Sequence, residues 1–301
     1  MGAGHGHDLG HAGGRHRWRL ALSFGLVASF FGVELAFGLI SGSLALLSDA
    51  GHMAADVVAL GAALVATRIA NRPDASGRRT YGSYRAEVFA SGLAVLLMLG
   101  VAGYVVVEAI SRIGDVVEVQ TGTMMLVGGI GLLVNLMALF LLRGGASESL
   151  NVKGAYLEVV ADTAGSVGVV VAGWLVATTG QPVWDTVVAL AIGAFVAVRA
   201  VFLGRQVLAV LGQHVPAGMS IDGVTTDLST IAGVEDVHDL HVWTLTSGMH
   251  VATAHLVARE EMAIQTVLDE ARDVLRERHG IAHATLQVEP STGTRCQDVN
   301  W

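Results

Sequence analysis

Two short groups of ionisable residues stand out because each lies inside an otherwise apolar stretch. The string SDAGHMAAD contains Asp49, His52 and Asp56, and the string YLEVVAD contains Glu158 and Asp162. Residues three or four positions apart lie on one face of a helix, so we expect each group to project in one direction. A carboxylate at the centre of a membrane helix costs on the order of 3 kcal/mol on insertion scales. These side chains therefore need a partner, water or a metal ion.

His52, Asp56, Glu158 and Asp162 together offer one imidazole and three carboxylates, and each of two helices contributes two of them. Nitrogen and oxygen atoms at about 2 Å suit a four-coordinate divalent metal ion. The single cysteine, Cys296, excludes a multi-cysteine zinc site. Small residues beside the ligands would let the two helices approach closely; they are Gly51, Ala55, Ala59, Ala161, Gly165 and Gly168. The alternative is that the two groups only form interhelical hydrogen bonds or salt bridges.

Three further polar residues in the apolar stretches are expected to have other roles. Glu34 and Asn135 are interpreted as packing or cavity-lining groups, and Glu108 as a side chain that reaches the membrane interface.

The composition of the whole chain indicates a membrane protein. Of its 301 residues, 52% are hydrophobic and 15% are charged, and the mean hydropathy is +0.58. Soluble domains average about 25% charged residues, and a membrane helix needs about 20 mostly apolar ones. Six segments meet that need, at Trp18–Ile40, Ser43–Ile69, Ala86–Ile110, Thr121–Leu142, Ala155–Thr178 and Val183–Leu203. Both ligand groups would then lie near the middle of the membrane.

The distribution of basic residues predicts the orientation. They gather before the first segment, between the second and third, and between the fourth and fifth, at Arg15, Arg17, Arg19, Arg72, Arg78, Arg79, Arg143 and Lys153. By the positive-inside rule both termini are expected in the cytoplasm.

The remaining C-terminal part has the pattern of a small α+β domain. Ser220–Ile231 is predicted as a helix, Val234–Thr246 and Met249–Ala258 as strands, and Ala284–Glu289 as a last strand. A helix between them follows from the apolar positions between Ile264 and Leu275. The expected division is a His-rich tail over residues 1–17, a membrane domain over 18–205, the αββαβ domain over 206–291 and a short tail over 292–301. A domain of about 85 residues is small and would gain stability from dimerisation.

Histidines recur in the tail domain and before the first membrane segment. The tail domain has His238, His241, His250, His255 and His283, with Glu289 near its end. A histidine on a half-buried strand is more often hydrogen-bonded than metal-bound, so a structural role for each stays open. His5, His7, His11 and His16 form either a flexible metal-binding tract or a segment without a role.

The chain resembles the zinc branch of the cation diffusion facilitator family of divalent-metal exporters. The resemblance rests on SLALLSDAGHMAADVVALG, TYGSYRAE, AYLEVVADTAGSVGVVVAG and VHDLHVWTLTSG, in that order. It implies a homodimer that exchanges cytosolic Zn²⁺, or Co²⁺, Cd²⁺, Fe²⁺ or Mn²⁺, for protons. It also implies a ferredoxin-like cytoplasmic domain that binds metal at the dimer interface.

The resemblance assigns the transport site to His52, Asp56, position 158 and Asp162. The zinc branch usually has histidine at position 158, where this chain has Glu158, and the harder ligand set favours Mn²⁺ or Fe²⁺ more than usual. In the tail domain the resemblance favours His238, His255, His283 and Glu289 as ligands and leaves His241 and His250 as structural residues. The family's histidine after TYG is replaced here by Ser83 and Tyr84.

The expected function is proton-coupled export of a divalent transition-metal cation, first of all Zn²⁺, across the bacterial inner membrane. The alternatives are an exporter selective for Mn²⁺, Fe²⁺, Co²⁺ or Cd²⁺, and a membrane metal receptor that does not transport. No enzymatic activity is expected, because the HExxH signature of metallohydrolases does not occur. A net charge of −8 argues against a nucleic-acid partner.

Overall fold

The protein is described by a computed structural model that covers residues 17–70, 81, 83, 85–113, 118–144, 150–246, 248–259 and 263–291. The chain divides into two compact units, Met1–Ala62 with Gly92–Leu203 and Ala63–Ser91 with Gly204–Trp301. The histidine tract from His5 to His16 lies outside the described residues, as do Arg72, Arg78 and Arg79.

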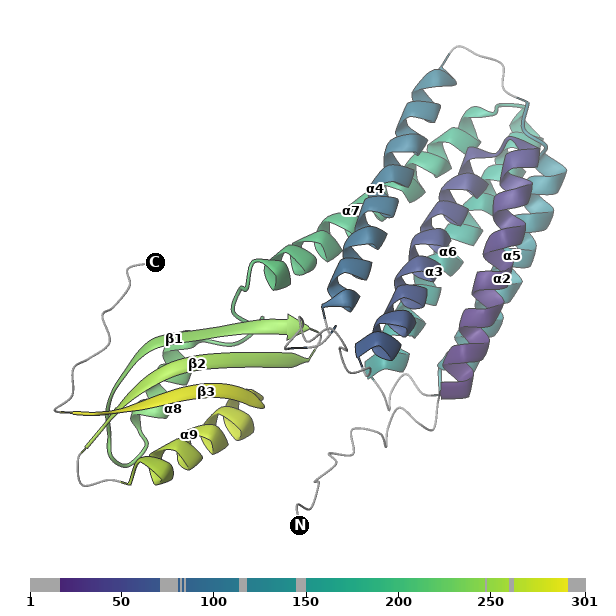
Figure 1. Ribbon diagram of the computed structural model, residues 1–301. Helices are drawn as coiled ribbons and strands as arrows, with labels where there is room; N and C mark the ends of the chain where they lie inside the picture. The colour runs from purple at the N-terminus through teal and green to yellow at the C-terminus, as the bar shows by residue number, and fades with distance from the viewer. Residues whose placement is uncertain are drawn as a thin grey trace. The chain divides into compact units, whose positions relative to one another are not determined.

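Six long helices form the membrane domain (Figure 1). They are α2 (Arg17–Ser41), α3 (Leu44–Ala70), α4 (Ala86–Ser111), α5 (Thr121–Leu142), α6 (Leu150–Thr179) and α7 (Val183–Leu211). Among the described residues, all of these except α3 contain a stretch that is long and apolar enough to cross a membrane, and α3 is the helix with Asp49, His52 and Asp56. The predicted six-helix membrane domain followed by an α+β domain is confirmed. Helix α7 continues past Leu203, where the sequence predicted that its apolar segment ends. Arg205 and Gln206 end the apolar run, but both residue types favour helix.

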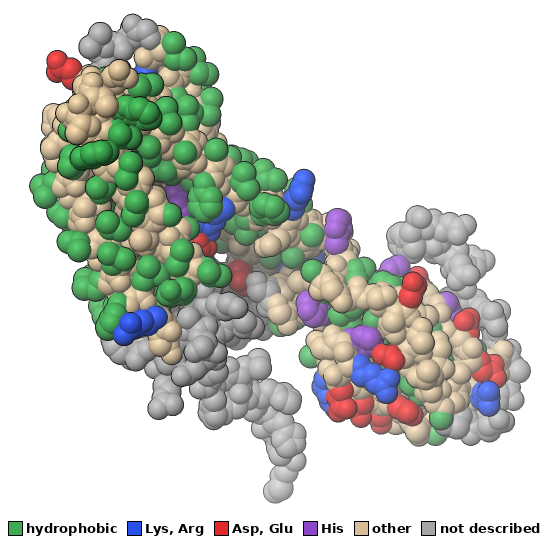
Figure 2. All heavy atoms as spheres, turned by 180° about the vertical axis from the view of Figure 1, so that it is seen from behind, with side chains coloured by type: hydrophobic (Ala, Val, Ile, Leu, Met, Phe, Trp, Pro, Cys, Tyr) green, Lys and Arg blue, Asp and Glu red, His purple; other side chains and the backbone are tan. Residues whose placement is uncertain are grey.

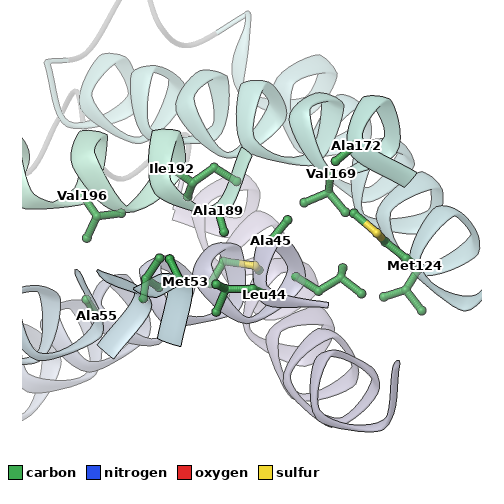
Figure 3. Packing of buried hydrophobic residues seen from close by; sticks show 14 of the residues in the cluster. Leu44, Ala45, Met53, Ala55, Met124, Val169, Ala172, Ala189, Ile192 and Val196 are labelled. Atoms are coloured by element: carbon green, nitrogen blue, oxygen red, sulfur yellow. The ribbon is translucent and has the colours of Figure 1, made fainter. Parts of the chain in front are cut away.

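Small side chains allow the helices of the membrane domain to pack closely. Ala45, Met53, Ala189 and Ile192 belong to one buried cluster, in which α3 meets α7 (Figure 3). A Cβ atom added at Gly51 of α3 would collide with the side chain of Val101 on α4. The outer surface of this domain is rich in exposed hydrophobic side chains (Figure 2), as expected for helices that contact lipid.

A buried carboxylate of α7 fixes the start of α3. The Asp185 side chain is fully buried and accepts hydrogen bonds from the Ser43 hydroxyl at 2.6 Å and from the backbone N–H groups of Leu44 and Ala45 at 2.7 and 3.1 Å. The Arg112 guanidinium donates to the same carboxylate at 3.4 Å. A negative charge at a helix N-terminus is favourable, so Asp185 ties α7 to the helix that carries His52 and Asp56.

The C-terminal unit has the predicted αββαβ order. Its elements are α8 (Ile221–Ser229), β1 (Val234–Thr246), β2 (Met249–Ala258), α9 (Ile264–His279) and β3 (His283–Pro290). The sheet has the order β1-β2-β3, with β1 and β2 antiparallel and β2 and β3 parallel. Both helices cover one face of the sheet (Figure 1), where Leu228, Leu256 and Leu275 are fully buried. Gly280 ends α9 in the left-handed conformation, at φ +67°, as predicted.

Candidate metal sites

Three of the four predicted membrane ligands lie together. His52, Asp56 and Asp162 each offer one ligand atom, and these atoms all lie within 4.8 Å of one another. His52 Nδ1 is 3.7 Å from Asp56 Oδ2, and His52 Nε2 is 3.5 Å from Asp162 Oδ1. Within the described chain, His52 Nδ1, Asp56 Oδ2 and Asp162 Oδ1 are buried without a hydrogen-bond partner. A divalent cation would satisfy the two carboxylate oxygens, and the imidazole can bind it only through the ring nitrogen that carries no proton.

The fourth predicted ligand, Glu158, is held by a basic side chain of α7. Glu158 lies one turn before Asp162 on α6, and both of its carboxylate oxygens are 2.6 Å from Arg199 Nη2. The same guanidinium reaches His52, because Arg199 Nη1 lies 2.9 Å from His52 Nε2. Phe195, one turn earlier on α7, packs edge-on against the His52 ring. Helix α7 thus covers the ligand cluster and adds a positive charge to it.

Arg199 is a functional candidate that the sequence interpretation missed. It is an ionisable residue inside the apolar string FVAVRAVFLG, and the same signal had singled out the acids of α3 and α6. Its presence changes the charge of the site. An ion of +2 with the three carboxylates of Asp56, Glu158 and Asp162 sums to −1, and the +1 of Arg199 brings the total to zero.

Asp49 does not join this cluster, although it lies one turn before His52. Its carboxylate meets Gly165 of α6, where an added Cβ atom would collide with Asp49 Oδ1. Asp49 interacts instead with Glu34 and with Ser166. The expectation that Asp49, His52 and Asp56 project in one direction therefore holds for the last two only.

A second group of possible ligands lies on the sheet of the C-terminal unit. His238, His255 and Glu289 each offer one atom within 4.8 Å of the others. His255 Nδ1 is 2.7 Å from Glu289 Oε1, and His238 Nε2 is 3.8 Å from Glu289 Oε2. His238 and His255 are directly opposite each other on β1 and β2. Two imidazoles and one carboxylate form a set that suits Zn²⁺.

The other histidines of this unit lie outside that group. His283 begins β3 opposite Val251, whereas His255 is opposite Gln287. His241 Nε2 lies 2.9 Å from Asp239 Oδ1, and His250 Nδ1 lies 3.3 Å from the Thr244 hydroxyl. His241 and His250 thus have side-chain partners of their own on the sheet.

A bundle of membrane helices with a buried metal-ligand cluster, joined to a small α+β domain with a second cluster, defines a class of membrane metal transporters. The sequence matches two family descriptions, "Cation efflux transmembrane domain" over residues 20–211 and "Cation efflux protein, cytoplasmic domain" over residues 216–291. The chain belongs to this cation efflux family, also named the cation diffusion facilitators, as the sequence motifs predicted.

Similar proteins cover almost the whole chain. The "Cation efflux system protein CzcD" of Alcaligenes sp. is 41% identical over 292 residues, which are 96% of this chain and 90% of that protein. The "Cadmium, cobalt and zinc/H(+)-K(+) antiporter" of Bacillus velezensis is 32% identical over 94% of this chain and 92% of its own length. The "Zinc transporter ZitB" of Escherichia coli is 33% identical over 92% and 90%, respectively. The chain is thus a multi-pass membrane exporter of metal cations and not an enzyme.

Proposed function

We propose that the protein exports divalent transition-metal ions, with Zn²⁺ preferred, from the cytoplasm in exchange for protons. The convergence of His52, Asp56 and Asp162 inside the membrane domain carries the proposal, because one carboxylate oxygen of each aspartate is buried there without a partner. One nitrogen and two oxygen ligands suit Zn²⁺ and leave a coordination position open, as an ion in transit requires. Two of the relatives are named for zinc and one of these also for H⁺.

Arg199 is proposed to hold the site in the absence of metal. A guanidinium can only donate hydrogen bonds, so His52 Nε2 accepts from Arg199, and a neutral ring then has its proton on Nδ1. A metal ion bound through Nε2 needs the same lone pair, and an ion bound by Glu158 needs the oxygens that Arg199 occupies. Arg199 and the metal ion therefore compete. The guanidinium would move aside when the ion binds and return when it leaves.

Proton exchange follows from the chemistry of these ligands. Carboxylates bind metal in their deprotonated forms, and Asp56 and Asp162, each with an oxygen that has no hydrogen-bond partner, would take up protons when the ion leaves. Moving a +2 ion outward against 100 mV, interior negative, costs about 4.6 kcal/mol, and one returning proton halves that figure. Rocking of the helices around the fixed cluster would expose it to the two sides in turn.

A different metal preference is the second candidate, and Glu158 favours it. If Arg199 releases Glu158 when the ion arrives, the site has one imidazole and three carboxylates, which is a harder set than the zinc branch usually offers. Mn²⁺ or Fe²⁺ would then be exported in preference to Zn²⁺.

Proteoliposomes test the transport proposal directly. With a pH gradient imposed, the native protein should move Zn²⁺ across the membrane, and Asp56→Ala or Asp162→Ala should reduce that flux to the level of empty liposomes. Asp222→Ala, at an exposed position of α8, is the matched control and should transport normally. Undiminished flux in both site variants would refute the assignment. Binding of Zn²⁺ by the native protein without any flux would identify a receptor instead.

We propose a homodimer in the bacterial inner membrane with both termini in the cytoplasm; the family description matched by the tail bears the name ZT_dimer. The cluster of His238, His255 and Glu289 would bind cytosolic metal as a sensor, with His283 supplying a further ligand only if its strand end moves. Metal bound across a dimer interface would stabilise the dimer by mass action.

A further inference from the structure

A second group of polar side chains is buried in the membrane domain, apart from the metal ligands. Glu34 of α2, Asp49 of α3, Asn135 of α5 and Ser166 of α6 are each at most 1% exposed. Asn135 Nδ2 donates to the Ser166 hydroxyl at 3.1 Å, Ser166 interacts with Asp49, and Asp49 interacts with Glu34. Four helices thus contribute one connected cluster. Glycine at position 165 leaves the space that the Asp49 carboxylate fills.

The oxygen atoms of this cluster outnumber its donors. Glu34 Oε1 and Oε2, Asp49 Oδ1 and Asn135 Oδ1 are buried without a hydrogen-bond partner among the described residues. Among the residues that the structure describes, neither Glu34 nor Asp49 has a salt bridge to a lysine, arginine or histidine. The ionisable group that faces both acids electrostatically is another carboxylate, Asp162 of α6. If both acids were ionised, the cluster would therefore hold two negative charges with no positive charge beside them.

Ionisation of both acids would require a cation beside them. Burial of an unpaired carboxylate is strongly unfavourable, and two neighbouring carboxylates also repel each other in a low-dielectric interior. All the available ligand atoms are oxygens, which suit hard cations and a shared proton but not soft metal ions. The histidine of the neighbouring metal site has no counterpart here.

We propose that Glu34, Asp49, Asn135 and Ser166 form a second intramembrane site, which holds one monovalent cation. The occupant is a proton shared by the two carboxylates or an alkali-metal ion bound by the oxygens of the cluster. Asp49 lies one turn from His52 on α3, and Ser166 lies one turn from Asp162 on α6. The two sites share both helices, so the ion at the second site influences metal binding at the first. The second site would hold its ion whether or not the first site transports metal.

Infrared spectroscopy of the full-length protein in nanodiscs distinguishes the occupants. A shared proton gives the carbonyl band of a buried carboxylic acid, and that band should disappear in Glu34→Gln and Asp49→Asn. Glu108→Gln, which changes a partly exposed acid paired with Arg112, is the control and should retain it. A bound alkali-metal ion gives no acid band. In that case Na⁺ or K⁺ should raise the melting temperature of the native protein above the value measured with choline as the only buffer cation. The melting temperatures of the two variants should not respond.

Two measurements keep the test decisive if the acid variants fold poorly. Zn²⁺ binding, measured on both variants, reports whether the neighbouring site is intact. Ser166→Ala removes one neutral oxygen and should weaken alkali binding about fivefold, or else shift the frequency of the acid band. The proposal is overturned if the native protein shows neither an acid band nor alkali stabilisation, or if the signal persists unchanged in Glu34→Gln, Asp49→Asn and Ser166→Ala.

Discussion

Arg199 and Glu158 form an ion pair inside the membrane domain, with 2.6 Å between Arg199 Nη2 and either carboxylate oxygen. The position at which this chain departs from the usual zinc-branch ligand is therefore the one that binds a basic side chain. The charge of Arg199 balances the extra negative charge that Glu158 brings to this position. We infer that Glu158 and Arg199 act as a unit, so a change to either alters how the site binds metal.

Removal of the Arg199 charge should strengthen metal binding and slow metal release. In Arg199→Gln the competitor for His52 Nε2 and Glu158 is gone, and the metal-loaded site has a net charge of −1. We expect the Kd for Zn²⁺ to fall about tenfold, which corresponds to 1.4 kcal/mol. Competition with a chromophoric chelator on protein in nanodiscs measures this affinity, and proteoliposome flux measures release.

Arg205→Gln is the matched control for that experiment, because Arg205 is an exposed arginine farther along the same helix. It should leave the affinity for Zn²⁺ unchanged. Weaker Zn²⁺ binding in Arg199→Gln would contradict the competition and would mean that Arg199 orders the ligands.

Replacement of Glu158 by histidine should shift the metal preference toward Zn²⁺. Glu158→His exchanges a hard carboxylate for an imidazole, so the site has two imidazoles and two carboxylates. This ligand set favours Zn²⁺ over Mn²⁺. We expect the ratio of Zn²⁺ to Mn²⁺ flux to rise about tenfold in a competition assay. Glu158→Gln separates the two causes, since it removes the charge without adding a nitrogen ligand. An equal rise in Glu158→Gln would assign the selectivity to charge alone.

Helix and strand positions followed directly from the sequence, whereas partner choice inside the membrane domain did not. The i,i+4 spacing placed His52 and Asp56 on one face, and the apolar periodicity predicted β1 and β2 with their observed ends. At 100° per residue Asp49 is turned about 60° from His52, which directs it toward α2 and α6. Which side chains Asp49 and Arg199 meet depends on the rotation of the neighbouring helices, which a single sequence does not specify.

The separation of His283 from the tail cluster has a similar origin. Parallel pairing places Gln287 opposite His255, and His283 lies four residues earlier, about 13 Å along the strand at 3.3 Å per residue. The histidine content of the tail was readable in the sequence, but the register of a parallel strand was not.

Asp185 is expected to be important for the stability of the membrane domain. Asp185→Ala leaves the Arg112 guanidinium, the Ser43 hydroxyl and two N–H groups at the start of α3 without their acceptor. Loss of one partner of a buried charge pair costs about 3–5 kcal/mol, so the melting temperature in detergent should fall by several degrees. Asp222→Ala, in the exposed first turn of α8, should leave it within a degree. An unchanged melting temperature in Asp185→Ala would mean that water replaces the carboxylate.

The tail cluster should bind one metal ion per chain in addition to the ion bound at the membrane site. In the full-length protein, His255→Ala removes the imidazole that lies 2.7 Å from Glu289 and opposite His238. Loss of one ligand of three should reduce the metal affinity of the tail cluster about a hundredfold. The membrane site of Asp56 and Asp162 should retain its metal affinity. Equilibrium dialysis should therefore show about one Zn²⁺ fewer per chain at micromolar free metal.

His250→Ala is the appropriate control, because His250 lies on the same strand but is hydrogen-bonded to Thr244 and lies outside the cluster. It should retain the full stoichiometry.

The two variants together also test the sensor role. If the tail ion regulates transport, flux in His255→Ala should lose its steep dependence on metal concentration on the tail side, whereas flux in His250→Ala should keep it. An identical dependence in both variants would restrict the cluster to passive metal binding, and an unchanged stoichiometry in His255→Ala would remove the site altogether.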